Sequence, residues 1–75
     1  MKHKIGDTIR IKSIDWYNQN KNVDGTIFSG MTVPFIPQMS QYCGKKAKII
    51  EINSHGYYRL DIDYCSSDWS DWMLE

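Results

Sequence analysis

The side chains in this sequence that carry catalytic chemistry are few and far apart. The histidines are His3, close to the N-terminus, and His55, which precedes Gly56 in a segment typical of a tight turn. Asp61 and Asp63 alternate with apolar residues, a pattern that places both carboxylates on the solvent side of a strand. Because catalysis needs a nucleophile, a base and an orienting group within hydrogen-bond reach, and no such set is indicated, we predict that the protein is not an enzyme.

Metal binding would require the two cysteines, Cys43 and Cys65, to act together with the two histidines. Structural zinc sites take their ligands in close pairs, whereas these four residues are single and scattered. We therefore predict no metal and no other cofactor. A disulfide would suit an extracellular protein, but no signal peptide is visible, so we expect two reduced cysteines, with Cys43 as a small core side chain.

Ten aromatic residues in 75 support two interpretations. Because aromatic side chains dominate interface energetics, the first is a module that binds an unknown protein or peptide. Its candidate anchors are Trp16, Tyr17, Phe35, Tyr57 and Trp69. The second is that Trp16, Phe35 and Trp69 close a core that is barely large enough for so short a chain. Phe35 follows Pro34 in a segment that cannot pair regularly, and is the ring best placed to face outward.

The basic residues indicate a second class of partner. Residues 1–50 carry a net charge of +5 and residues 51–75 a net charge of −5, and we expect the two halves to neutralise each other across neighbouring strands. The alternative is a basic patch that follows the backbone of RNA or single-stranded DNA, with Tyr57 or Trp69 stacking on bases. Its candidate residues are Arg10, Lys12, Lys45, Lys46 and Lys48, with Lys2 and Lys4 ahead of them. Since the sequence pI is near 6.7, the protein partner is the leading hypothesis.

The first half of the chain predicts one strand and one long loop. In "KIGDTIRIKSI", residues 4–14, Ile5, Ile9 and Ile11 occupy odd positions among polar residues, which indicates a strand with one buried face. The following residues, 15 to about 32, predict a loop with a tight turn at Asp24-Gly25.

A short helical turn is predicted before Gly44. Pro37 suits the first turn of a helix, and Met39, Tyr42 and Cys43 would share one helical face. Gly44 is a residue that commonly ends a helix.

The second half predicts a hairpin and a closing strand. "KKAKIIEINS" and "YYRLDIDY", residues 45–54 and 57–64, predict two antiparallel strands joined by a turn at Gly56. Ala47 and Ile49 are out of phase with Ile50 and Ile52, which indicates a bulge in the first of them. A short strand around residues 72–74 follows.

This order of elements is typical of a small antiparallel barrel. The segments "IGDTIRI", "YCGKKAKIIEI" and "YYRLDID" and the Trp-containing end resemble the small bacterial barrels related to the KOW and SH3 groups, over most of the chain outside residues 18–33. Within that group the chain resembles an uncharacterised family of bacterial or mobile-element proteins. The resemblance implies one mainly β domain over residues 1–75, a small antiparallel SH3-like barrel of about five strands with a long loop after the first strand and one short helical turn.

The resemblance also bears on function. KOW-type barrels are often found with RNA or the ribosome, which favours the nucleic-acid hypothesis. The "ALYDY"-type segment that eukaryotic SH3 domains use for proline-rich peptides is absent, and Trp69 and Trp72 are not adjacent as in those domains. No run approaches the roughly 18 apolar residues of a membrane helix, and no apolar segment follows the basic start. We expect a cytoplasmic monomer without membrane contact.

Overall fold

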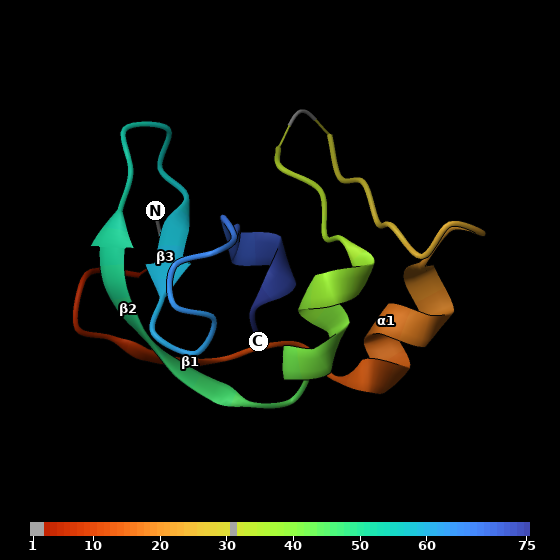
Figure 1. Ribbon diagram of the computed structural model, residues 1–75, viewed down its shortest axis with the longest axis horizontal. Coiled ribbons are helices and arrows are strands. Elements are labelled where there is room, and N and C mark those ends of the chain that lie inside the picture. The colour runs from red at the N-terminus through yellow and green to blue at the C-terminus, as the bar shows by residue number, and fades with distance from the viewer. Residues whose placement is uncertain (1–2, 31) are drawn as a thin grey trace.

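The computed structural model describes residues 3–30 and 32–75 and contains one antiparallel sheet with three short helices (Figure 1). In chain order the elements are β1 (Thr8–Arg10), α1 (Ile14–Asn20), the 3-10 helix η1 (Pro37–Tyr42), β2 (Lys46–Ile52), β3 (Tyr58–Leu60) and the 3-10 helix η2 (Asp71–Met73). The strand order is β1-β2-β3. Figure 1 shows α1 and η1 beside each other at one end of the sheet. None of the helices in the described part of the chain is long and apolar enough to cross a membrane.

The first predicted strand forms as β1, and its alternation explains its burial. Ile9 and Ile11 lie in the core, while Arg10 between them is exposed. Ile5 is 62% exposed, so the prediction that it belongs to the buried face is wrong. The physical reason is a turn at Gly6, whose φ of +96° reorients the chain before the strand begins.

β2 and β3 form the predicted antiparallel hairpin. In its turn, the side-chain Oδ1 of Asn53 accepts hydrogen bonds from the backbone N–H groups of His55 and Tyr57, both at 3.0 Å. This is the use of asparagine that favours it in turns. The predicted bulge is confirmed, because the register shifts between Ile49 and Glu51.

The predicted closed barrel of about five strands is wrong, because the sheet is open and has three strands. β3 ends at Leu60, earlier than predicted. In the turns that follow, Tyr64 and Cys65 have φ of 55° and 62°, a left-handed conformation that interrupts any strand. The predicted closing strand is the 3-10 helix η2.

Residues 69–75 lie against both outer edges of the sheet. Trp69 forms a bridge with Tyr58 of β3, in which each backbone N–H donates to the carbonyl of the other, at 2.8 and 3.0 Å. Leu74 forms a bridge with Ile11, directly after β1. η2 turns the chain between the two bridges. Because each contact is a single bridge, the segment covers the edges without adding a strand.

The predicted loop after the first strand contains a helix, α1, so the expectation of an irregular excursion is wrong there. Ser13 caps the helix, since its Oγ accepts a hydrogen bond from the backbone N–H of Trp16 at 3.2 Å. Tyr17 is buried from this helix. The tight turn at Asp24-Gly25 forms as predicted, with Gly25 at a φ of +86°.

η1 is the predicted helical turn before β2, and it contributes Met39 to the core. Pro37 is its first residue, and Gly44, with a φ of +79°, lies just beyond its end. The largest fully buried side chains come from every part of the chain: Trp69, Tyr58, Phe35, Ile11, Ile49, Leu60 and Met73. Aromatic rings thus fill much of a core that a chain of this length must build from few residues.

Candidate functional site

Three of the five candidate partner-binding aromatics lie in the core. Phe35 and Trp69 are fully buried, and Tyr17 is 6% exposed. The Phe35 ring centroid lies 5.2 Å from that of Trp16, 5.6 Å from that of Tyr17 and 5.9 Å from that of Trp69. A buried ring has no surface left for a partner, so the expected outward orientation of Phe35 is wrong. These rings stabilise the fold by packing on each other.

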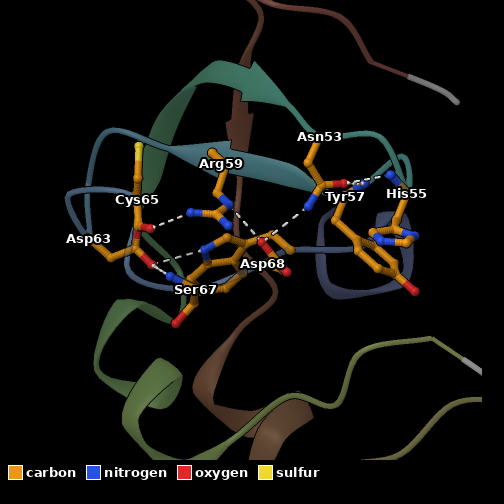
Figure 2. Close-up of polar contacts among 9 residues, drawn as sticks. Asn53, His55, Tyr57, Arg59, Asp63, Cys65, Ser67 and Asp68 are labelled. Carbon is orange, nitrogen blue, oxygen red and sulfur yellow. Dashed lines mark hydrogen bonds and ion pairs between the residues drawn. The ribbon is translucent and has the colours of Figure 1, made fainter.

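The other two candidate aromatics, Trp16 and Tyr57, are half-buried but do not share a surface. Trp16 belongs to α1, whereas Tyr57 lies in the turn between β2 and β3, on the opposite side of the molecule (Figure 1). Tyr57 packs beside His55, with ring centroids 6.3 Å apart (Figure 2). The five aromatics therefore do not form one binding surface.

Arg59 of β3 is held by two interactions of the segment that follows the strand (Figure 2). Its Nε lies 2.7 Å from the Oδ1 atom of Asp68, and its Nη1 donates a hydrogen bond to the backbone oxygen of Cys65 at 2.8 Å. The Nδ2 of Asn53 donates to the same Asp68 oxygen at 3.4 Å. Arg59 is the one basic residue of the acidic segment 51–75, and its charge is thus neutralised by a residue of the same segment.

Two further carboxylates, Asp63 and Asp71, also have internal roles. Asp63 is 2% exposed, so the prediction that it faces solvent is wrong. Its Oδ2 accepts hydrogen bonds from the Trp69 Nε1 and from the backbone N–H of Ser67, both at 3.1 Å (Figure 2). Asp71 accepts a hydrogen bond of 2.5 Å from the Tyr58 hydroxyl. These acids satisfy buried polar groups of the core and are not placed to neutralise the basic half.

Three of the five candidate nucleic-acid-binding residues come together on the outward side of β1 and β2. Arg10, Lys46 and Lys48 are all exposed. The register places Arg10 directly opposite Lys46, and Thr8 directly opposite Lys48. We call Arg10, Lys46 and Lys48 the basic face.

Opposite residues in antiparallel strands form either hydrogen-bonded or non-hydrogen-bonded pairs, and the side chains are closer in the second kind. Arg10 and Lys46 form a pair of this second kind. The backbone N–H of Ile11 donates to the backbone oxygen of Lys45 at 3.0 Å, on the side of β1 that faces β2. The backbone oxygen of Arg10 instead points to the other side of β1, where it accepts from the backbone N–H of Glu75. The odd-numbered residues of β1 therefore make the hydrogen bonds to β2, and Arg10 and Lys46 form a non-hydrogen-bonded pair. Side chains approach most closely in such pairs, and like charges placed there destabilise the sheet.

The other two candidates lie beside the basic face. Lys45 precedes β2 and, by alternation, has the orientation of buried Ala47, although its own side chain is exposed at the end of the sheet. Lys12 follows β1, and its Nζ lies 5.4 Å from the ring centroid of Trp16. Lys2 lies outside the described residues.

No residue of the basic face has an ion-pair partner within residues 3–30 and 32–75. The close contacts found there between basic and acidic side chains join Arg59 to Asp68 and His3 to Asp7. The expected neutralisation of the basic half by the acidic half is therefore wrong for this face, because the register places Lys46, and not an acid, opposite Arg10.

Two exposed acidic residues, Asp61 and Glu75, form hydrogen bonds with the backbone of residues in the basic face. The Oδ1 of Asp61 accepts a hydrogen bond from the backbone N–H of Lys48 at 3.0 Å. The backbone N–H of Glu75 donates to the Arg10 oxygen at 2.8 Å. The two acids reduce the local positive potential, and neither has an ion pair among the described residues.

The histidines and cysteines are separate from each other. The Nδ1 of His3 lies 3.9 Å from an oxygen of Asp7, and His55 is exposed in the hairpin turn. The described residues enclose no pocket and bring together no three side chains of the kinds that bind metals. Cys43 and Cys65 are both free and half-buried. Burial raises the pKa of the Cys43 thiol above its ordinary value, which lowers its thiolate fraction at neutral pH.

Sequence reasoning missed the group around Arg59 and the pairing of Trp16 with Trp72, whose ring centroids are 6.1 Å apart. No local pattern in the sequence links Arg59 to Asp68, nine residues later. The only available indication was the excess of acids in the last third of the chain.

Comparisons of the chain with protein-family models, with curated protein sequences and with solved structures give no match. The resemblance to KOW and SH3 barrels therefore stays a prediction from sequence, and the function must be argued from the basic face.

Proposed function

We propose that this protein is a non-enzymatic binding module whose basic face holds a single strand of RNA or DNA through its phosphates. The observation that carries the proposal is the direct opposition of Arg10 and Lys46 across β1 and β2, with Lys48 next on the same side. Three cations without an ion-pair partner among the described residues favour the binding of a repeated negative charge.

The opposition of two cations has a cost in stability that an anionic ligand removes. Like charges in directly opposite positions destabilise a sheet, whereas a phosphate between them attracts both. The guanidinium of Arg10 is held near the start of β2, because its Nη1 donates to the Gly44 oxygen at 2.9 Å. The guanidinium of Arg10 offers several hydrogen-bond donors in one plane, and the ammonium of Lys46 is a compact positive charge. Phosphate oxygens accept hydrogen bonds from both kinds of group.

A single strand fits this surface better than a protein partner does. Modules that bind single-stranded nucleic acid follow its backbone with a row of cations and require no deep pocket. The hypothesis of a protein partner relied on five aromatic anchors, of which Tyr17, Phe35 and Trp69 are in the core. The basic face, by contrast, consists only of exposed side chains.

The test is a salt-dependent titration of fluorescently labelled oligouridylate and oligothymidylate, about 12 nucleotides long, followed by anisotropy. If three phosphates are neutralised, log K falls with log salt concentration with a slope of about −2, from about 0.7 per contact on a single strand. Lys46→Gln removes one contact and changes the slope by about 0.7.

Lys45→Gln is the matched control, because it removes the same charge one residue away and off the basic face. We expect it to change the slope less than Lys46→Gln does. Equal effects of the two variants, or equal binding of poly-glutamate, would show that only net charge is sensed and would contradict the proposal. No binding at about 50 mM salt would also refute it, because phosphate contacts are strongest at low salt.

A further inference from the structure

The ammonium of Lys12, a residue just beyond the basic face, lies over the indole of Trp16. Lys12 lies two residues after Arg10, the last residue of β1, which is about 7 Å along an extended chain, and its Nζ lies 5.4 Å from the Trp16 ring centroid. Both side chains are half-buried. A lysine ammonium over an aromatic ring is attracted by the negative face of the ring.

The orientation of this indole is fixed from the core. The Phe35 ring meets it at an interplanar angle of 89° with centroids 5.2 Å apart, and Trp72 lies 6.1 Å away at 54°. The Nε1 of Trp72 in turn donates a hydrogen bond of 2.8 Å to Thr32. Trp16 therefore has a defined position, while the Lys12 ammonium over it is at the end of a flexible chain.

We infer that Trp16 is a stacking platform for one unpaired base of the strand that lies on the basic face. The base replaces the Lys12 ammonium over the ring, and the ammonium turns to the phosphate of the same nucleotide. This inference rests on the proposed function and adds the residue that contacts the base. It replaces the predicted stacking on Trp69, which is fully buried, and on Tyr57, which lies in the hairpin turn.

The exchange is favourable for two reasons. Stacking of a base on an aromatic side chain contributes more than an exposed cation over the same ring. The released ammonium also gains a charged partner, since it has no ion pair among the described residues. The rigid support by Phe35 and Trp72 means that little ordering of the protein accompanies binding.

The experiment compares oligothymidylate with an abasic deoxyribose-phosphate strand of the same length, followed by tryptophan fluorescence and by anisotropy. We expect the abasic strand to bind about tenfold more weakly, the effect of losing one stacked base. Oligothymidylate is expected to quench the fluorescence, and Trp16→Phe is expected to lose this quenching. Tyr57→Phe, the control variant, keeps it, because Tyr57 lies in the hairpin turn and Trp16 with its supporting rings is unchanged.

Equal affinities for the two strands, with the salt slope unchanged, would overturn the stacking inference and leave the basic face in place. Quenching that persists in Trp16→Phe would overturn it as well. If neither strand binds, the proposed function itself fails. Lys12→Gln provides a test that spares the core: because the displaced ammonium binds the phosphate of the stacked nucleotide, the variant is expected to reduce the salt slope for oligothymidylate by about 0.7, and an unchanged slope would contradict the exchange.

Discussion

Replacement of Lys46 by glutamine should make the protein more stable while weakening the proposed binding of nucleic acid. In the free protein, Lys46 lies directly opposite Arg10 in a non-hydrogen-bonded pair, without an ion-pair partner among the described residues. Cross-strand pairs of this kind contribute about 0.2–1 kcal/mol, and the sign is unfavourable for like charges. For 75 residues the entropy of unfolding is about 0.16 kcal/mol/K, from about 2.1 cal/mol/K per residue. The melting temperature of Lys46→Gln should therefore rise by about 1–6 °C.

Thermal unfolding followed by circular dichroism at low salt and at about 1 M salt measures this effect. The gain should be largest at low salt and shrink at high salt, where the screening length falls to about 3 Å. Lys45→Gln should change the melting temperature less, since its side chain is not opposite Arg10. A lower melting temperature for Lys46→Gln, or a gain that salt does not reduce, would refute the argument that the two cations repel each other.

The remaining predictions concern the core, one turn and one thiol. Phe35→Ala should lower the free energy of unfolding by about 3–5 kcal/mol, measured by urea denaturation, because the ring is fully buried; a loss below about 1 kcal/mol would contradict its central place. Gly25→Ala should lower the free energy of unfolding by about 1–3 kcal/mol, because φ is +86° and the new Cβ would lie 2.9 Å from the Pro37 Cγ. The loss should be larger than for Gly30→Ala, where φ is +60° and the new Cβ meets nothing within 4 Å. The alkylation rate of Cys43 should rise with pH to a midpoint above the ordinary thiol pKa of about 8.5, because burial disfavours the thiolate. For the same reason, the free energy of unfolding should fall as the pH rises past the pKa of this thiol in the unfolded chain. A midpoint below about 8.5 would contradict the raised pKa of Cys43.

Regular alternation made the paired strands predictable from the sequence. Ile9 and Ile11 on one side of Arg10, and the change of phase before Ile50, correctly indicated β1, the hairpin and its bulge. The helix α1 was missed because it has only seven residues and one buried side chain, Tyr17, which is too little for a helical period. The number of strands was overestimated because the chain turns after Leu60, where the buried Asp63 side chain accepts hydrogen bonds from Ser67 and Trp69 that strand alternation does not indicate.

The same distinction applies to the candidate site. The exposure of Arg10, Lys46 and Lys48 follows from strand alternation, a local property, and was predictable. Whether Phe35 and Trp69 face the core or the solvent depends on which segments pack together, and composition alone left both interpretations open. In a chain this small, packing takes up the large rings first.

The position of residues 69–75 has a consequence for how the chain folds during synthesis. The outer edges of β1 and β3 are met by Leu74 and Trp69, which leave the ribosome after the rest of the described sheet. Until then the three-stranded sheet exposes its two outer edges, on β1 and β3. Unpaired edges of this kind are the surfaces on which strands from other chains aggregate. The long separation between Ile11 and Leu74 also makes their pairing a late, slow step. Folding of this protein is therefore expected to be completed only after Leu74 has emerged.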